Sequence, residues 1–362
     1  MVSLNCRVGI VGAGTSGVYL GSLLARQGYQ VDVFEKSPVP RTDGCGILLV
    51  GSGMKAVNQG NPQLCQRLLH SGTPVKHFEF RNLKGGVANS ESVTYEENEL
   101  PGMLIHRKAI LEAVLAELPT NCLHLNASFV SATQTETGVT ATFSNGETWE
   151  GDLLVGSDGI FSKVREWVVP GVKPRYLGDI VWRGVVEDNE FCVDGMFVVY
   201  IRGRGIYANF FDLGNGYTHW GFFIEAEQTE AEKRLPCPHN VAIPPEELAK
   251  VPEAARAVIQ GTPIEQIVCN YSYDIDMLPK LYQGRILLIG DAAHAKSPTR
   301  ARGMTSGFED ALALSRYLTE SSTIDEALLG FQNERLPIVH EYQRTSREIS
   351  QKTGRNRPKK VA

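Results

Sequence analysis

A short apolar run near the start of the chain is followed by a periodic stretch. The run, Cys6 to Val11, is typical of a strand buried in a parallel sheet. Between Val18 and Leu24 the apolar residues recur at the spacing of one helical face. The chain therefore predicts a strand, a tight turn and a helix before residue 25.

More elements of both kinds follow in the first half of the chain. The pattern predicts a strand at 30–34 and a helical stretch at about 54–69. A helix led by 106–108 carries apolar residues at four-residue spacing from Ile110 to Leu118, so one face packs inward.

The middle of the chain has the character of antiparallel strands. Residues 139–143 and 148–153 flank Asn145-Gly146, a strong hairpin signal. From about 175 to 275, aromatic and β-branched runs alternate with glycine-rich turns, which predicts a mostly antiparallel sheet. Prolines near 236–245 mark an irregular loop before a helix at about 246–260, and a buried strand returns at 285–289.

Composition limits the class of protein. A chain of 362 residues predicts about two domains. The net charge of −5 argues against nucleic acid as a partner. Because no apolar stretch reaches the roughly 18 residues of a membrane span and no signal-peptide profile precedes the first strand, we expect a cytoplasmic protein. Seven scattered cysteines and eight histidines without ligand spacing predict neither disulfides nor a metal site.

The turn after the first strand carries a dinucleotide-binding fingerprint. Gly12 permits the tight turn, Gly14 lets the backbone approach a pyrophosphate, and Gly17 lets the helix pack closely on the strand. The N–H groups of the helix N-terminus favour phosphates. Glu35, 18 residues beyond Gly17, can accept both ribose hydroxyls and disfavours a 2′-phosphate, so we expect FAD or NAD. The predicted contacts here are Gly12, Gly14, Thr15, Ser16, Gly17, Glu35 and Lys36.

Two later motifs also follow buried strands. Ser157-Asp158-Gly159 is a turn, after which Ser162 and Arg165 fall on one helical turn.

The last motif, Gly290-Asp291, precedes Pro298 and a helix that begins near Gly303. Phosphates would repel Asp291, so its expected partner is a hydroxyl such as those of a ribityl chain. The helix N-terminus at Gly303 and Met304 can face an electron-rich ring edge. We interpret His294 as a packed or capping histidine.

With these three motifs in this order, the chain resembles the single-component FAD-dependent aromatic hydroxylases, the p-hydroxybenzoate hydroxylase-like family. The resemblance extends to about residue 345. It implies an α/β fold, in which a Rossmann-like FAD-binding domain of the glutathione reductase type receives an inserted, mostly antiparallel substrate domain and ends in helices. The implied FAD-binding domain is 1–72, 101–174 and 276–345, the substrate domain is 73–100 and 175–275, and 346–362 is a tail.

The resemblance also implies which residues contact the cofactor. Beyond the first motif, they are Arg107, Asp158, Arg165, Gly290, Asp291, Pro298, Gly303 and Met304. Asp158 and Arg165 are further implicated in handling NAD(P)H. Ala301-Arg302-Gly303 departs from the Gly-Gln-Gly that is usual before the last helix. The Arg302 guanidinium either stabilises the reduced flavin, binds an anionic substrate or points to solvent.

The implied activity is that of a monooxygenase. NAD(P)H, which has no second fingerprint in the chain and is expected to bind transiently, reduces FAD. O2 then forms a flavin C4a-hydroperoxide, which hydroxylates or epoxidises a small, aromatic substrate. The sequence does not indicate the oligomeric state.

The sequence does not identify the substrate, and it leaves several candidates for the catalytic residues. Candidates for catalysis are Arg183, Pro298 and Arg302; Arg183 either binds an acidic substrate, orients the flavin or pairs across domains. Tyr207, Tyr217 and His219 lie in sheet segments where alternate side chains point away from any pocket. No general base is evident.

Two other functions are considered. A flavin-dependent halogenase shares the nucleotide core, but the chain lacks a Trp-x-Trp-x-Ile-Pro segment. A non-catalytic, redox-responsive flavoprotein would bind FAD without substrate-stimulated oxidation of NAD(P)H.

Overall fold

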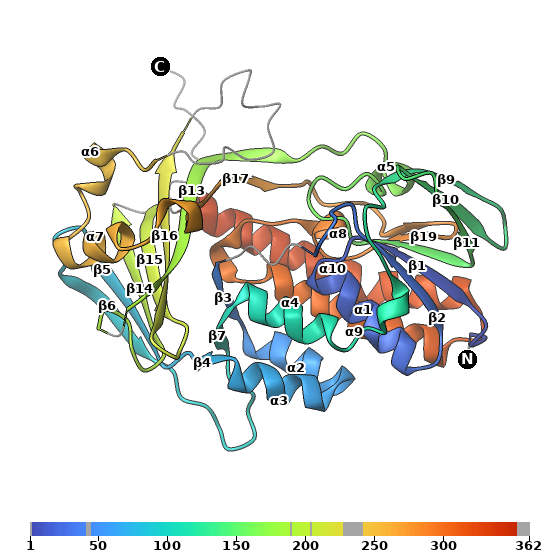
Figure 1. The fold of residues 1–362 in the computed structure, drawn as a ribbon, viewed down its shortest axis with the longest axis horizontal. Coiled ribbons are helices and arrows are strands. Elements are labelled where there is room, and N and C mark those ends of the chain that lie inside the picture. Colours follow the sequence, from blue (N-terminus) through green and yellow to red (C-terminus); the bar gives the residue numbers. More distant parts are fainter. Residues whose placement is uncertain (1, 41–44, 189, 203–204, 227–241, 353–362) are drawn as a thin grey trace.

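One half of the molecule is built on a six-stranded, mostly parallel sheet. The computed structural model describes residues 2–40, 45–188, 190–202, 205–226 and 242–352 (Figure 1). The strand order is β18-β19-β12-β1-β2-β8, and only the pair β18 and β19 is antiparallel. The strands are β1 (Arg7–Val11), β2 (Gln30–Phe34), β8 (Leu123–His124), β12 (Leu153–Gly156), β18 (Tyr282–Gln283) and β19 (Ile286–Leu288). β1, β12 and β19 are almost wholly buried, as expected of parallel strands covered on both faces.

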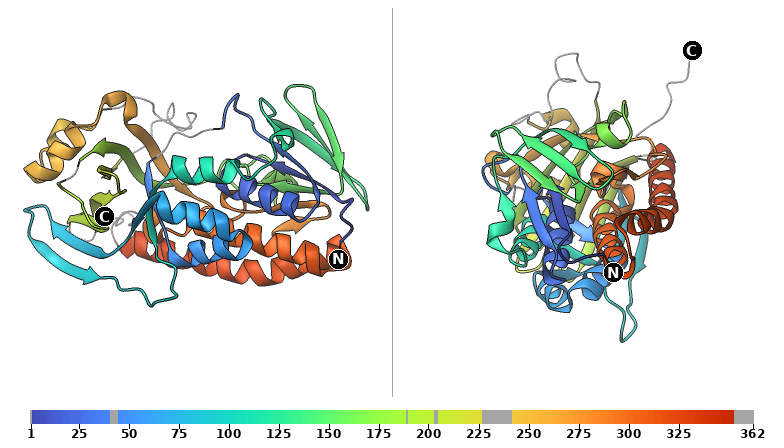
Figure 2. Two further views of the ribbon diagram at one scale, coloured as in Figure 1. Left: turned by 60° about the horizontal axis from the view of Figure 1, so that its bottom comes forward. Right: turned by 90° about the vertical axis from the view of Figure 1, so that its right-hand side faces the viewer.

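Helices pack beside this sheet, and most of them lie between it and the strands at the other end of the molecule (Figure 1). α1 packs on α9 and α4, and α9 packs also on α2 and α10. Figure 2 shows α9 and α10 side by side along the length of the molecule. The helices are α1 (Thr15–Arg26), α2 (Gly51–Gly60), α3 (Pro62–His70), α4 (Arg107–Leu115), α5 (Arg165–Val168), α8 (Asp291–His294), α9 (Gly303–Glu320) and α10 (Ile324–Lys352). A small antiparallel sheet, β11-β10-β9, lies beside β1 and β12; its strands are β9 (Phe129–Gln134), β10 (Val139–Phe143) and β11 (Thr148–Gly151).

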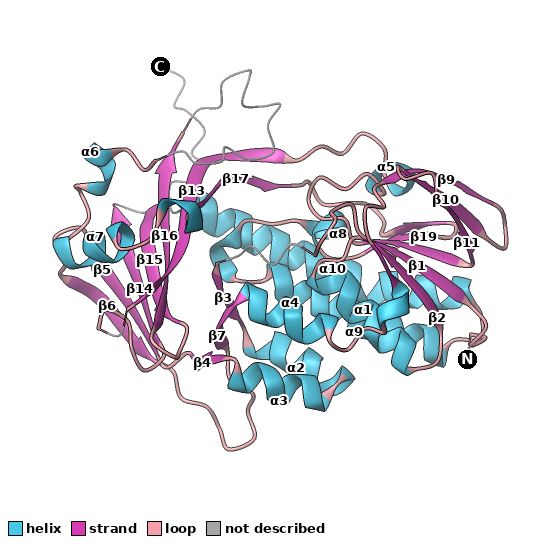
Figure 3. Cartoon of the chain, in the orientation of Figure 1, coloured by secondary structure: helices cyan, strands magenta, loops and turns pink. Residues whose placement is uncertain are grey.

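The other half is a seven-stranded sheet of order β17-β13-β16-β15-β14-β5-β6, antiparallel except between β14 and β5. Its strands are β5 (His77–Asn82), β6 (Val87–Ser92), β13 (Arg175–Glu187), β14 (Met196–Arg202), β15 (Gly205–Asp212), β16 (Tyr217–Glu225) and β17 (Val268–Asp274). Figure 3 shows strands at both ends of the molecule with most helices between them. The predicted α/β fold with an antiparallel sheet is confirmed, while the residues at which the domains divide stay a prediction.

The two faces of the seven-stranded sheet meet different neighbours. Trp182, Phe210 and Phe222 share a core with residues of α7 (Glu253–Gln260). On the opposite face, Phe211 belongs to a second small core that includes Leu104. That residue lies in the three-stranded sheet of β3 (Gly46–Leu49), β7 (Met103–His106) and β4 (Gly72–Pro74). The second face is therefore the one that meets the nucleotide-binding half.

Two predicted helices are each broken in two. The stretch at 54–69 divides at Asn61, whose side chain accepts the N–H of Leu64 at 3.1 Å and caps α3. The stretch at 246–260 divides into α6 (Pro245–Leu248) and α7, and Pro252 precedes the second helix. The sequence prediction treated each stretch as one continuous helix. The capping Asn61 interrupts the first stretch, and Pro252 interrupts the second.

Two further boundaries differ from the prediction. The predicted strand at 148–153 ends at Gly151, and Leu153 begins β12 of the parallel sheet instead. The predicted tail at 346–362 is helical as far as Lys352, because α10 continues to that residue; the remainder lies outside the described residues. Within the described part of the chain, no helix is long and apolar enough to cross a membrane.

Candidate functional site

A groove opens at the carboxyl ends of β1 and β2, where the first two sequence motifs meet. Its walls include the glycine-rich loop 12–14, Glu35 and Lys36 after β2, Arg107 at the start of α4, and residues 157–159. Ligands in open α/β sheets bind at this edge. The predicted contacts Gly12, Gly14, Glu35, Lys36, Arg107, Asp158 and Gly159 therefore all line one groove.

The three glycines of the first motif have two different roles. Gly12 has a φ of +105°, and a Cβ there would stand 2.5 Å from the carbonyl oxygen of Ser157. A Cβ on Gly17 would stand 2.2 Å from the carbonyl oxygen of Gly12. Gly14 is extended, and a Cβ there would meet no atom within 4 Å. Gly12 and Gly17 therefore allow close packing, whereas Gly14 leaves the groove open in front of α1.

The N-terminus of α1 is open for an anion. Gly14 is its N-cap residue and offers no side chain to the first-turn N–H groups. Thr15 is buried. Ser16 packs against the last motif, because Cβ atoms on Gly290 and Gly307 would lie 2.9 and 1.9 Å from its Oγ. Free N–H groups in front of an unobstructed glycine are the arrangement that a pyrophosphate requires.

Glu35 is fixed by the loop that it adjoins. Its Oε2 accepts the N–H of Ala13 at 3.0 Å, and its Oε1 accepts the N–H of Ser37 at 3.0 Å. Each carboxylate oxygen retains a free lone pair, so the side chain can still accept two ligand hydroxyls. The carboxylate is therefore oriented before any ribose binds.

Arg107 enters the groove from the opposite wall. Its backbone N–H donates to the carbonyl of Cys45 at 3.0 Å, which joins α4 to the segment before β3. His106 caps this helix, because its Nδ1 accepts the N–H of Lys108 at 3.0 Å. Burial, with a smaller contribution from Lys108, lowers the pKa of His106. A neutral His106 suits the role of an acceptor.

The Asp158–Gly159 turn is held by its own carboxylate. Asp158 accepts the hydroxyl of Ser162, the N–H of Lys163 at 2.7 Å and the N–H of Val164 at 3.2 Å. Gly159 has a φ of +79°. The turn thus presents its backbone, rather than a free carboxylate, to the groove.

Arg165 is not among the residues that line this groove, and its predicted contact with the cofactor stays a prediction. Its guanidinium is buried and donates to the carbonyls of Ala292 at 2.9 Å and Ile160 at 2.7 Å. It joins the turn after the middle motif to α8 of the last motif. The placement indicates a structural role for Arg165 behind the cofactor site.

The last motif is anchored by a buried carboxylate. Asp310 on α9 accepts the N–H of Gly290 at 2.9 Å, Nε2–H of His294 and Nε–H of Arg335 at 2.8 Å. The charge of Arg335 and the hydrogen bonds from Gly290, His294 and Arg335 hold the pKa of Asp310 well below the usual range despite burial. His294 is buried, as expected of a packed histidine. Asp291, in contrast, is exposed at the start of α8.

A lysine extends this buried network. Nζ of Lys296 donates to Nδ1 of His294 at 2.9 Å and to Oγ of Ser306 at 2.8 Å. Burial lowers the pKa of Lys296 to about 8. Sequence reasoning missed Lys296, Asp310 and Arg335, because nothing in their spacing shows that they share one cluster.

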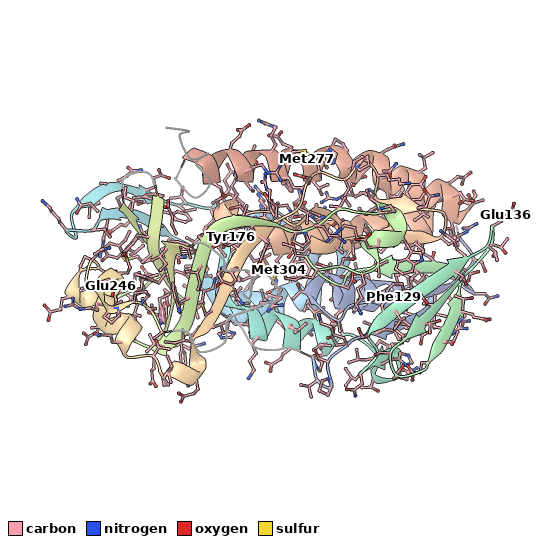
Figure 4. All side chains as sticks on the ribbon, turned by 90° about the horizontal axis from the view of Figure 1, so that it is seen from above. Phe129, Glu136, Tyr176, Glu246, Met277 and Met304 are labelled. Carbon is pink, nitrogen blue, oxygen red and sulfur yellow. The ribbon has the colours of Figure 1, made fainter. Side chains whose placement is uncertain are left out.

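The turn before α9 carries the residues predicted to face the flavin ring. Ala301 has a φ of +52°, a conformation that favours glycine. A Cβ on Gly303 would lie 3.9 Å from Oδ1 of Asp291, so the two ends of the last motif face each other. In Figure 4 Met304 lies near the middle of the molecule, between Tyr176 of β13 and Phe129 of β9.

Two residues of this turn sit at its outer side. Pro298 begins a short 3₁₀ turn and is exposed. Arg302 donates to Oγ of Ser52 at 2.8 Å, and its guanidinium carbon lies 5.0 Å from the ring centre of Tyr342. Arg302 thus connects the start of α9 to α2 and α10.

The sheet residues singled out in the sequence divide between the two faces. Arg183 is partly buried on β13, on the face that meets β3. His219 lies on the same face, where its Nδ1 accepts the N–H of Gly46 at 3.1 Å; burial, then the charge of Arg183, keeps its pKa well below the usual value. Tyr207 points to the other face, where its hydroxyl donates to the carbonyl of Glu247 at 2.8 Å. Tyr217 is exposed.

Comparison with known proteins gives one consistent result. The protein family described as "FAD binding domain" matches residues 5–346. The chain is 28% identical over 360 residues to aurachin C monooxygenase/isomerase of Stigmatella aurantiaca, covering 94% of this chain and 88% of that one. It is 28% identical over 384 residues to salicylate hydroxylase of Pseudomonas putida, covering 96% and 86%.

Solved structures share the fold. HpxO of Klebsiella pneumoniae, in complex with FAD and uric acid, superposes with a TM-score of 0.85 at 20% identity, covering 96% of this chain and 89% of that one. For 2,6-dihydroxypyridine-3-hydroxylase of Arthrobacter nicotinovorans the TM-score is 0.84 at 20% identity, covering 100% and 96%.

Proposed function

Because the chain belongs to the FAD binding domain family, whose aromatic-hydroxylase members are FAD-dependent monooxygenases, we propose that it hydroxylates a small aromatic substrate with NAD(P)H and O2. Its relatives of similar length include enzymes named for salicylate and for 3-amino-4-hydroxybenzoate. The substrate proposed here is accordingly an electron-rich ring.

The residues present fit FAD. The free N–H groups of α1 and the open space at Gly14 suit the pyrophosphate, and Glu35 suits the adenosine ribose. The exposed Asp291 suits hydroxyls of the ribityl chain, and the N-terminus of α9 suits the electron-rich edge of the ring. Bound FAD would supply the redox chemistry, with NAD(P)H as the two-electron reductant and O2 as the oxidant, so that one oxygen atom would enter the substrate and the other would leave as water.

The protein's own task is to hold the cofactor and the substrate in position and to exclude water. The Asp310 cluster locks Gly290, His294 and α10 together, so the turn that carries Asp291 is rigid. The antiparallel sheet supplies a wall whose face towards β3 carries an apolar cluster that includes Phe211 and Leu213. A dry, fixed site is what oxygen transfer requires, because water would divert the reaction.

One observation carries the proposal: the three motifs, far apart in sequence, contact one another. Gly12 packs on Ser157, and Ser16 packs on Gly290 and Gly307. A chance set of glycine turns would have no reason to share these contacts.

The test is oxidation of NADH and NADPH by the FAD-loaded protein, with oxygen consumption, against phenols, anthranilates and polyketide aromatics. We expect one ring compound to accelerate both rates and to gain 16 mass units as one oxygen atom is inserted. A halogenated product would point instead to a halogenase. FAD binding with no compound accelerating oxidation would favour a redox-responsive binding protein.

A further inference from the structure

The side chain of Lys296 joins two helices at the expected flavin site. Its Nζ donates to Nδ1 of His294 on α8 at 2.9 Å and to Oγ of Ser306 at 2.8 Å. Ser306 lies in the first turn of α9, and its hydroxyl donates in turn to the carbonyl of Arg302 before that helix. Lys296 is therefore tied to the N-terminus of α9.

The starts of α8 and α9 face each other beside this lysine. A Cβ on Gly303 would lie 3.9 Å from Oδ1 of Asp291. Among the charged groups around Lys296, Asp291 acts on it most strongly, and Lys296 itself is only partly covered by protein. The lysine thus borders the space between the two helices, where the electron-rich edge of the flavin is expected.

The Lys296 ammonium lacks a contacting counter-ion. It has three donors, and in the part of the chain that the structure describes they reach no carboxylate, only an imidazole and a hydroxyl. The imidazole is neutral, because burial and then the charge of Lys296 lower the pKa of His294. Burial lowers the pKa of Lys296 in turn to about 8. A negative charge nearby would therefore favour the protonated form.

Three buried groups beside Lys296 keep one charge state between pH 7 and 10. The pKa of Asp310 is held well below its usual range, burial lowers that of His294, and the charges of Asp310 and Glu309 raise that of Arg335 despite burial. Of these four buried groups, only Lys296 titrates in that range. The charged and titratable groups that face Lys296 from α8, α9 and α10 are Asp291, His294, Glu309, Asp310 and Arg335.

We propose that Lys296 is a proton site coupled to reduction of the flavin. When a hydride from NAD(P)H reduces the ring to its anion, the neutral Lys296 amine takes one proton from solvent. FAD, NAD(P)H, the amine and that proton thus give the reduced anion, NAD(P)⁺ and the ammonium. The inference rests on the proposed function only in placing FAD at this site, and it does not depend on the substrate.

The experiment is a spectroelectrochemical titration of the FAD-loaded protein from pH 7 to 10. Uptake of one proton with two electrons lowers the reduction potential by about 30 mV per pH unit, and uptake of two protons lowers it by about 60 mV. We expect the smaller slope near pH 7, where Lys296 is already charged in the oxidised protein. Above pH 8 the slope should become steeper and approach the larger value.

Two variants separate the charge of Lys296 from its titration. Lys296→Met should lower the potential at pH 7 by about 30 mV or more, a tenfold change in the two-electron equilibrium, and keep the one-proton slope throughout. Its curve should meet that of the unmodified protein near pH 10, where both lack the charge in the oxidised and reduced states. Lys296→Arg stays charged, so it should match the unmodified protein at pH 7 and exceed it at pH 10.

Lys108→Met is the control, because Lys108 is an exposed lysine of α4 and its loss should leave the potential unchanged. A one-proton slope for the unmodified protein over the whole range would overturn the proton site, whether or not the variants fold. So would a steep slope that persists in Lys296→Met or Lys296→Arg, because another group would then take the proton. Lys296→Gln, which can still donate to His294, repeats this arm if the other two variants unfold.

FAD content is measured on every sample, so that two kinds of failure are distinguished. If the unmodified protein does not bind FAD, the proposed function is refuted. If FAD binds but the potential lacks this dependence on pH, the proton site alone is refuted and Lys296 only holds α8 and α9 together.

Discussion

Gly17 lies so close to Gly12 that a Cβ on Gly17 would stand 2.2 Å from the carbonyl oxygen of Gly12. Three residues before Gly17, Gly14 has an ordinary extended backbone and open space where a side chain would project. The same motif therefore contains glycines that folding requires and a glycine that only the ligand requires.

Replacement of Gly14 separates these two requirements. We expect Gly14→Val to fold with an unchanged melting temperature and to lose most of its FAD, because the new side chain occupies the space in front of α1. Flavin absorbance after gel filtration measures occupancy, and thermal unfolding of the apoprotein measures stability.

Gly17→Val is the control, and it should lower the melting temperature because its side chain would meet backbone. Full flavin occupancy in Gly14→Val would show that the pyrophosphate does not lie at this helix.

Arg165 should prove to be a structural residue. Arg165→Met leaves the carbonyls of Ala292 and Ile160 without their buried donor, so the free energy of unfolding should fall by about 2–4 kcal/mol. Arg344→Met, which removes an exposed arginine paired with Glu341 and Glu348 of its own helix, should leave stability unchanged. Chemical denaturation of both variants checks this. A variant with unaltered stability but slow flavin reduction would instead support a role in handling NAD(P)H.

The pKa of Lys296 gives the stability a specific dependence on pH. Burial lowers this pKa from 10.5 to about 8 in the folded protein. Between pH 8 and 10.5 the Lys296 side chain is protonated in the unfolded chain but largely deprotonated in the folded protein. The contribution of Lys296 to the free energy of unfolding therefore rises with pH above 8 and is constant below it. The groups that act on Lys296 are Asp291, Asp310, Glu309, Arg335 and His294.

Lys296→Met should remove this dependence. From pH 8 to 9.5 the unmodified apoprotein should gain about 1–2 kcal/mol relative to the variant. Lys108→Met, on the exposed side of α4, serves as the control because its lysine is in solvent. If the free energies of unfolding of Lys296→Met and of the unmodified protein change equally with pH across this range, the Lys296 ammonium keeps its ordinary pKa.

Local patterns were sufficient for the nucleotide-binding half. The strand, turn and helix around Gly12 and the acid at residue 35 are contiguous in sequence, so geometry follows from spacing. Spacing could not show that Arg165 turns back onto Ala292 or that Asp310 meets Gly290, because both contacts depend on how distant segments pack.

The antiparallel half was harder to interpret for a different reason. A one-residue shift reverses the face of every side chain in a strand, and β14 and β15 shift register between Tyr200 and Ile201. That irregularity sends Tyr207 away from β3, whereas Asn209 lies on the near side. Alternation alone could not distinguish the two.

The departure at Arg302 permits a test of whether this guanidinium acts on the flavin that we expect at the start of α9. Its guanidinium is held at the start of α9 by Ser52 and Tyr342. Reduced flavin carries negative charge, so a nearby cation stabilises it relative to the oxidised form; at about 5 Å with an effective dielectric of about 20, the interaction is at most about 3 kcal/mol. Since about 30 mV corresponds to 1.4 kcal/mol for two electrons, Arg302→Gln should lower the reduction potential by some tens of millivolts.

Arg316→Gln is the matched control for this potential. Arg316 lies further along the same helix and also covers an aromatic ring, with its guanidinium carbon 4.5 Å from the ring centre of Tyr317. Loss of one cation and one cation–π contact is therefore common to both variants; Arg316 differs in its distance from the N-terminus of α9 and in its ion pairs with Glu320 and Glu334. Spectroelectrochemical titration should show a shift for Arg302→Gln alone, while benzoate affinity, measured in parallel, reports whether Arg302 binds an anionic substrate instead. Equal potentials and equal benzoate affinities in the two variants would assign Arg302 to the joint between α2, α9 and α10 and remove it from the reaction.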